Sequence, residues 1–229
     1  MININQVYKS VLVVLQQEKR GVLTPVEFNK VATQAQQEIF IEYFDELNQL
    51  LRQPQTSLAY ADRYALLDEK IQIFKRTENL QTDVNSQVTP TVAVQELGSV
   101  IYFSTSASEG REAQRIQQYE VFTTNQSPLT APSERYPVYT YENNVIQLYP
   151  TSIGVPSPVF KNVQLNFLKY PADVKWGFTI DTELGNYIYN EQSSVNFELH
   201  QSDEPLLVDK ILGYAGVMTR DQLALQLAA

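Results

Sequence analysis

The chain has 229 residues, a length that suits one domain or two close-packed lobes. Its 17 Lys and Arg residues stand against 26 Asp and Glu residues, which gives a net charge of −9. This balance argues against a surface that binds nucleic-acid phosphates, because such surfaces need clustered Lys and Arg. The absence of cysteine excludes disulfide frameworks and thiolate metal sites.

The N-terminal sequence predicts neither a secretory signal nor a membrane anchor. The short apolar stretch in MININQVYKSVLVVLQQEKR has no basic region before it and no small-residue cleavage site. No run in the chain reaches the roughly 18 apolar residues that span a bilayer. We therefore expect a protein that folds in the cytosol in which it is made and has no membrane partner.

Two helix starts are predicted near the N-terminus. Apolar residues at three- and four-residue intervals, with Asn3 as the cap, predict a helix from about Ile4 to Lys19. Thr24, Pro25 and Glu27 form the sequence pattern of a capping box, which predicts a second, long helix after Thr24.

The long helix carries a wider apolar stripe than a lone surface helix needs. Phe40 and Phe44 widen this stripe, so we expect the helix to meet more than one neighbour and name both as candidate intersubunit contacts. A third apolar series, from Tyr60 to Phe74, predicts a helix that closes with Lys75 and Arg76. The N-terminal third is therefore expected to form three antiparallel helices.

After the third helix the chain turns polar, and strands are predicted beyond it. The clearest signal is a hairpin, with runs 138–141 and 145–149 on either side of Glu142-Asn143-Asn144. Alternation predicts further strands around Val100 to Ser104, Val163 to Tyr170 and Val195 to Leu199. The segment from Glu109 to Phe122 is ambiguous, and we favour a helix there.

The predicted fold class is α+β, with an N-terminal antiparallel helical bundle joined by a C-terminal helix and a β-rich middle segment that contains a Tyr-rich hairpin. The expected boundaries are 1–85 for the helical bundle, 86–201 for the β-rich portion and 202–229 for the C-terminal helix. That last helix is expected to return to the bundle. Its start, Ser202-Asp203-Glu204-Pro205, is acidic and capped.

The residues offer little for catalysis. His200 is the single histidine, and a structural role at a strand-to-helix turn is favoured over a metal site with Asp203 and Glu204, which suit the first turn of a helix. Asp181 and Glu183 could pair as carboxylates of a hydrolase, but a solvated loop is the preferred interpretation. No nucleotide-binding or hydrolase motif is present. We therefore predict no catalytic, cofactor-binding or metal-binding residues.

Tyrosine is the unusual residue, with 14 copies in the chain. Four of them, Tyr136, Tyr139, Tyr141 and Tyr149, lie around the predicted hairpin. These side chains could pair across strands, contact another subunit or stack on sugars or bases. We name the four as candidate intersubunit contacts. Trp176 is expected to anchor its loop.

Three passages of the chain carry a resemblance to a known family. The first, IxxVYKxVLxxxQxExRGxLTPxEFNxxAxQAQxEIFxxYF, runs from Ile4 to Phe44. The second, NQSPLTAPSERYPVYTYENNVIQLYP, runs from Asn125 to Pro150, and the third, VNFELHQSDEPLLVDKILGYAGV, from Val195 to Val217. Together they resemble structural proteins of crAss-like and related tailed phages.

The resemblance implies a virion protein of the neck, a ring subunit of the head-to-tail connector below the portal, in a ring that is usually twelvefold. Its partners would be further copies of itself, the portal protein and other tail or ring proteins. DNA would pass through the channel during ejection without specific binding. The resemblance implies no cofactor. The alternative expectation, from the aromatic hairpin, is a tail-associated glycan- or host-binding module.

Overall fold

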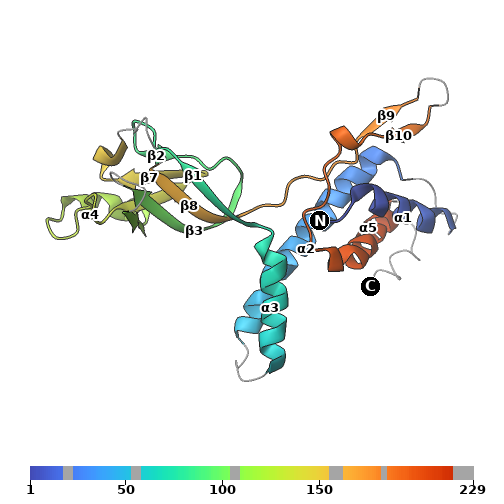
Figure 1. Ribbon diagram of the computed structural model, residues 1–229, viewed down its shortest axis with the longest axis horizontal. Coiled ribbons are helices and arrows are strands. Elements are labelled where there is room, and N and C mark those ends of the chain that lie inside the picture. Colours follow the sequence, from blue (N-terminus) through green and yellow to red (C-terminus); the bar gives the residue numbers. More distant parts are fainter. Residues whose placement is uncertain (18–22, 53–57, 104–108, 155–161, 182–184, 219–229) are drawn as a thin grey trace. The chain divides into compact units, whose positions relative to one another are not determined.

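The structure, a computed structural model, describes residues 1–17, 23–52, 58–103, 109–154, 162–181 and 185–218 (Figure 1). This part of the chain holds five α-helices and ten β-strands, which confirms the α+β class. The chain divides into two compact units. We call Met1–Ile73 with Pro171–Ala229 the helical unit and Phe74–Tyr170 the β unit.

The unit boundaries differ from the predicted boundaries near residues 85 and 201. The polar stretch after the third helix contains strand β1 (Lys75–Leu80), so the β unit begins earlier than expected. Lys75 and Arg76 accordingly start a strand and do not close helix α3 (Leu58–Gln72). The chain after Tyr170 belongs to the helical unit, where Val174, Trp176, Phe197 and Leu199 are buried.

Both predicted helix starts are confirmed. In α1 (Ile4–Gln17) the Asn3 side-chain oxygen accepts hydrogen bonds from the backbone N–H groups of Asn5 and Gln6, at 2.9 and 3.2 Å. In α2 (Pro25–Leu51) the Thr24 N–H donates to the Glu27 carboxylate at 3.0 Å, and the Glu27 N–H donates to the Thr24 hydroxyl at 3.4 Å. The predicted end of the first helix at Lys19 lies outside the described residues.

The last helix packs against the first two. Helix α5 (Glu204–Met218) contacts α1 and α2, and α3 contacts α2. On α5, Lys210 lies 2.7 Å from the Glu42 carboxylate, and one turn later the Tyr214 hydroxyl donates to Glu38 at 2.9 Å. The later residue on α5, Tyr214, contacts the earlier residue on α2, Glu38, so the two helices run in opposite directions.

Polar side chains of α2 hold the returning chain before α5. The fully buried Gln36 amide donates to the Ala172 carbonyl at 2.8 Å and accepts from the Glu198 N–H at 2.9 Å. The predicted strand Val195 to Leu199 is wrong as a regular strand, because only isolated bridges form, Ile2 with Phe197 and Lys175 with Val195. Phe197 is nevertheless fully buried in the helical unit, next to its bridge partner Ile2.

Trp176 anchors this returning segment, as predicted. Its ring lies 4.6 Å from the Tyr8 ring and 5.6 Å from the Tyr189 ring, measured between centroids, and it is buried. Its indole N–H donates to the Asn5 side chain at 3.2 Å, and its backbone N–H donates to Asn29 at 2.7 Å. The neighbouring strands β9 (Phe178–Ile180) and β10 (Tyr187–Tyr189) form a two-stranded hairpin.

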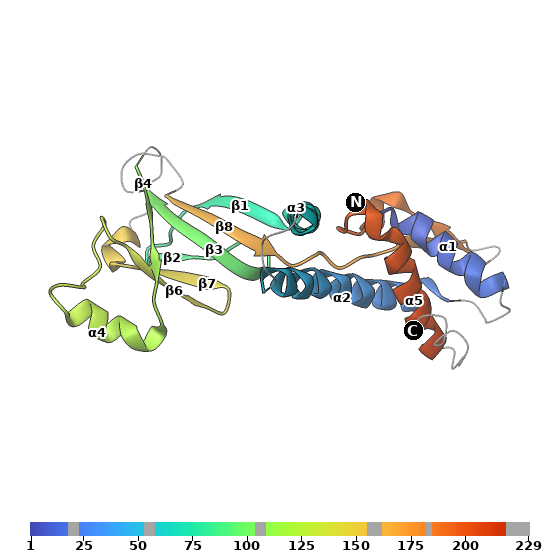
Figure 2. The ribbon, with the colours of Figure 1, turned by 90° about the horizontal axis from the view of Figure 1, so that it is seen from below.

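The β unit contains two four-stranded sheets, which Figure 2 shows as separate layers. The first sheet has the order β1, β8 (Val163–Lys169), β3 (Val94–Phe103), β4 (Gly110–Glu112). The second has the order β2 (Gln87–Val88), β7 (Val145–Tyr149), β6 (Val138–Glu142), β5 (Gln114–Arg115). Their apolar faces share one core that includes Val100, Ile146, Leu148 and Leu165.

The chain from Gly110 to Arg115 joins the two sheets, since β4 pairs with β3 and β5 pairs with β6. The favoured helix from Glu109 to Phe122 is therefore wrong over most of its length. Helical structure begins only with a 3₁₀ turn, Gln118–Glu120, and the short helix α4 (Val121–Gln126). The three-residue spacing of Tyr119 and Phe122 gave a wrong prediction, because both side chains are exposed and do not form the buried face of a helix.

The predicted hairpin is confirmed. Strands β6 and β7 pair from Val138 with Tyr149 to Glu142 with Val145. Asn143 and Asn144 form the two-residue turn with φ angles of 48° and 63°. Positive φ at both positions matches the right-handed twist of the strands, and asparagine tolerates it.

We predict that Phe197→Ala lowers the free energy of unfolding of the helical unit by about 3–5 kcal/mol, because the side chain is fully buried and its loss leaves a cavity. Trp176 is the single tryptophan of the chain, so its fluorescence in a urea titration reports this unit. The control, Val195→Ala, removes a part-exposed side chain and should cost less than about 1 kcal/mol. Equal losses for the two variants would contradict the proposed packing.

Candidate interaction surfaces

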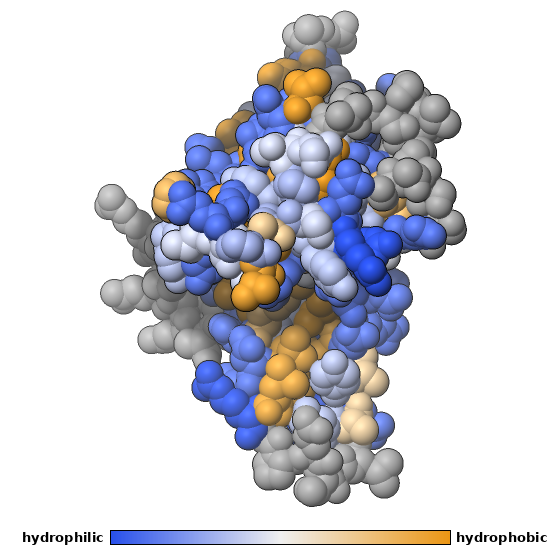
Figure 3. Space-filling model, turned by 90° about the vertical axis from the view of Figure 1, so that its left-hand side faces the viewer, coloured by the Kyte–Doolittle hydropathy of each residue, from blue (hydrophilic) through white to orange (hydrophobic). Residues whose placement is uncertain are grey.

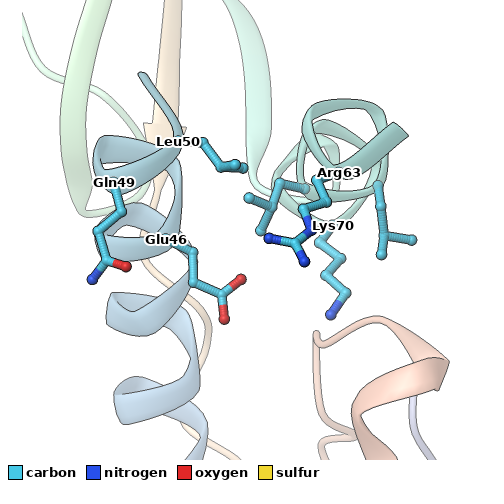
Figure 4. A pocket seen from close by; sticks show the side chains of 7 residues that line it. Glu46, Gln49, Leu50, Arg63 and Lys70 are labelled. Atoms are coloured by element: carbon cyan, nitrogen blue, oxygen red, sulfur yellow. The ribbon is translucent and has the colours of Figure 1, made fainter. Parts of the chain in front are cut away.

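A groove lies between α2 and α3 of the helical unit, with a volume of about 370 Å³ (Figure 4). Leu50 on α2 and Leu67 on α3 are buried and form its floor, whereas Leu66 is 49% exposed. The groove is lined by Glu46, Gln49, Leu50, Arg63, Leu66, Leu67 and Lys70. Three leucines and four polar or charged side chains therefore line this groove.

Charged side chains of opposite sign face the groove from its two walls. Glu46 reaches into it from α2, and Arg63 reaches towards it from α3 (Figure 4). Within the described part of the chain neither side chain makes a hydrogen bond or an ion pair. The rim thus offers a free carboxylate and a free guanidinium on either side of leucine side chains.

Apolar surface continues beside the groove. Leu51 and Tyr64 are exposed close to its lining residues in sequence. Figure 3 shows an apolar strip in the lower part of this face of the molecule. Contiguous exposed apolar surface of this kind marks an interaction site in soluble proteins.

A buried polar network holds α3 in place. The Lys70 ammonium lies 2.7 Å from one oxygen of the Asp203 carboxylate, and the Tyr43 hydroxyl donates to the other at 2.5 Å. Burial, and then the Asp203 carboxylate beside it, raises the pKa of the Tyr43 hydroxyl well above its usual value. The network joins α2, α3 and the start of α5, so Asp203 is a structural centre and not only a first-turn carboxylate.

His200 has the structural role that the sequence favoured. Its Nδ1 accepts from the Ser202 backbone N–H at 3.3 Å and caps the 3₁₀ turn Gln201–Asp203 before α5. Its Nε2 lies 3.8 Å from the Glu69 carboxylate, a long contact. The cap and the Asp203 network therefore fix the same turn.

The β unit carries a second exposed surface, which we call the aromatic surface. Its members, from the 3₁₀ turn Gln118–Glu120, from α4 and from the following loop, are Tyr119, Phe122, Leu129 and Tyr136. The Arg135 guanidinium lies 5.7 Å from the centroid of the Tyr136 ring, a cation–π arrangement. An open cavity of about 500 Å³ is lined by Leu129, Tyr136 and Val138, among other residues. Sequence analysis did not name Tyr119, Phe122 or Leu129 as candidate contacts, because it used the interval of Tyr119 and Phe122 only as evidence for a helix.

The structure separates the candidate intersubunit contacts into three groups. Phe40 and Tyr139 are buried in the cores of their own units, so neither can contact another chain without unfolding. Phe44, Tyr141 and Tyr149 are half-buried, and Phe44 packs edge-on against Phe40 with 5.0 Å between ring centroids. Tyr136 alone among the six is largely exposed.

The candidate carboxylate pair cannot be assembled from the described residues. Asp181 closes β9, where its N–H donates to the Asn186 carbonyl at 2.9 Å, and Glu183 lies outside the described residues. Within the described ranges, no three His, Asp or Glu side chains are placed to bind a metal ion. The described helices include none with the length and apolarity needed to cross a bilayer.

Comparison with models of known protein families finds no match. Comparison with curated proteins also finds no match.

We predict that Asp203→Ala lowers the free energy of unfolding of the helical unit by about 3 kcal/mol, because it leaves the part-buried Lys70 ammonium without its carboxylate partner. Lys70→Met combined with Asp203→Ala should cost less than the sum of the two single changes, by roughly 1–3 kcal/mol. Urea titrations followed by Trp176 fluorescence measure both quantities.

Asp209→Ala is the matched control, since Asp209 is an exposed carboxylate on the same helix and should change stability by less than about 0.5 kcal/mol. Strictly additive losses for Lys70 and Asp203 would show that the network does not hold α3.

Proposed function

We propose that this chain is a virion structural protein, a ring subunit of the head-to-tail connector of a tailed phage. The observation that carries the proposal is the pair of exposed apolar surfaces, one on each unit, outside two well-filled cores. Groups of exposed leucine and aromatic side chains are typical of surfaces that bind a partner.

The three passages that resemble phage structural proteins support the proposal through their positions. The first covers α1 and most of α2, and the third covers the bridge at Phe197 and α5. These two passages pack together in the helical unit. The second passage covers the end of α4 and the β6–β7 hairpin, beside the aromatic surface.

The proposed division of labour follows from these surfaces. The helical unit packs against neighbouring copies and the portal through the α2–α3 hairpin. The β unit extends the ring or contacts the next tail component through the aromatic surface. The net charge of −9 suits a channel through which DNA slides, because negative surface repels phosphates.

The alternative function, a glycan- or host-binding module, was suggested by the tyrosines of the β6–β7 hairpin. Tyr139 is buried and Tyr141 is half-buried against the core, so these rings do not form an open stacking platform. Binding on a glycan array would revive this function and count against the connector.

The direct test is the mass and shape of the purified chain, alone and mixed with the portal protein of the same phage. The proposal predicts a closed ring in native mass measurements and in electron micrographs. A chain that stays monomeric under both conditions and is absent from purified virions would contradict it.

The aromatic surface gives a further prediction. Phe122→Ser should leave stability within about 0.5 kcal/mol, because Phe122 is 68% exposed. It should reduce the amount of chain recovered with assembled particles by about tenfold, the effect of losing one interface anchor. Val84→Ser is the matched control, since Val84 in the same unit is also 68% exposed and lies outside the surface. Equal recovery of the two variants would exclude this surface from assembly.

A further inference from the structure

Strand β1 forms one edge of the first sheet of the β unit. The sheet order β1, β8, β3, β4 pairs β1 on one side only, and Figure 2 shows β1 at the margin of this sheet. Four of its six residues are exposed. An edge strand of this kind presents backbone groups to which another extended strand can bind.

The pairing with β8 decides which backbone groups of β1 face outwards. The Lys169 N–H of β8 donates to the carbonyl of Phe74, directly before β1, at 3.0 Å. Hydrogen-bonded pairs alternate with non-hydrogen-bonded pairs along an antiparallel ladder, so every second residue after Phe74 bonds to β8. The backbone groups of the residues between them, Lys75, Thr77 and Asn79, therefore point away from β8. In the described part of the chain, no second strand pairs with β1 on this side.

The side chains of β1 include charges of both signs. Arg76 and Glu78 lie on the face of the strand that is turned to the core, opposite Phe167 and Leu165 of β8. Thr91 holds the Glu78 carboxylate in place, because its backbone N–H donates to the carboxylate at 3.1 Å and its hydroxyl donates as well. Within the described ranges, neither Arg76 nor Glu78 forms an ion pair.

These charges are self-complementary when two copies of β1 run antiparallel. Outward backbone groups of one copy can bond only to outward groups of the other, which limits the possible registers. The register centred on Thr77 places Arg76 of each copy opposite Glu78 of the other. The two neighbouring registers place Arg76 opposite Arg76 or Glu78 opposite Glu78, and like charges directly opposite each other are destabilising. Charge therefore selects the register centred on Thr77 over its neighbours.

We propose that two copies of the free chain pair through the outer edges of β1, antiparallel and about a two-fold axis at Thr77. The first sheets of the two copies then join into one continuous sheet. Thr77 suits the axis because it is uncharged and β-branched, and cross-strand Thr pairs are favourable. The charges on either side of it also disfavour strands that lack the complementary pattern.

This pair is a state of the free chain and goes beyond the proposed ring. A two-fold contact uses the same surface on both chains, whereas a ring repeats a contact between two different surfaces. Pairing through β1 therefore stops at two copies. It covers an edge that would otherwise be open to uncontrolled strand addition before the chain meets other subunits.

An exchange of charges tests the register. Arg76→Glu places carboxylates opposite each other in the pair, and Glu78→Arg places guanidinium groups opposite each other. Native mass measurements over a range of concentrations, without the portal protein, should show dimerisation about tenfold weaker for each variant alone, because two attractive contacts become repulsive. An equal mixture of the two variants should dimerise as strongly as the original chain, since each guanidinium then faces a carboxylate.

The control exchanges charges on exposed strand residues of the second sheet, with Arg115→Glu and Glu142→Arg. These variants match the first two in charge and should change dimerisation by less than about twofold. Equal weakening by both sets of variants would show a general effect of charge and overturn the inference. A mixture of Arg76→Glu and Glu78→Arg that dimerises as weakly as either variant alone would also overturn it.

Amide hydrogen exchange of the unchanged chain gives a second measurement, which does not depend on the folding of a variant. The Thr77 and Asn79 amides should exchange about tenfold more slowly at concentrations where most of the chain is paired, because they then lie within a ladder. The Glu112 amide faces outwards on β4, at the opposite edge of the same sheet, and should not respond to concentration. Slowing at Glu112 without slowing at Thr77 and Asn79 would place the contact at the other edge and overturn the inference.

The outcomes for the pair and for the ring are separate. Rings that assemble from a chain that never pairs through β1 would contradict this inference and leave the proposed function intact. Pairing through β1 in a chain that never forms a ring and is absent from virions would support this inference and contradict the proposed function.

Discussion

The rest of the structure depends on the contacts of Trp176 with α1 and α2 and on the burial of Phe197 beside Ile2. These contacts bring the chain after residue 171 back onto the helices that begin the protein. Gln36, buried at the middle of α2, ties two parts of this returning segment through one amide group. With the segment fixed, α5 packs on α1 and α2, and the β unit becomes an insertion between residues 73 and 171.

The same returning segment positions the groove. It ends at Asp203, whose carboxylate binds Lys70 of α3 and Tyr43 of α2 at the N-terminal end of α5. The polar network thus holds α3 at a fixed place on α2 while their outer leucines stay uncovered. A subunit built for assembly needs this combination, because a rigid apolar surface binds a partner with less loss of conformational entropy than a loose one.

The sequence predicted local features well and long-range ones poorly. The cap at Thr24 and the turn at Asn143 and Asn144 depend on neighbouring residues, and both are confirmed. Strand β1 was missed because KRTENL is a polar edge strand without alternation, and the strands from Gly110 to Arg115 were missed because they are short and part-exposed. Of the candidate contacts, Phe40 and Tyr139 proved to be core residues. The partners of Asp203 lie far from it in sequence, so no local pattern could reveal them.

In the proposed connector, the exposed apolar surfaces outside the two cores are covered by other subunits. The measurement that tests this proposal most directly is a reconstruction of the intact virion by electron cryo-microscopy. The proposal predicts that the helical unit and the β unit each fit density repeated around the axis between head and tail, with both apolar surfaces covered by neighbouring chains. Density for these units at the tail tip or on a fibre, or their absence from the particle, would contradict it.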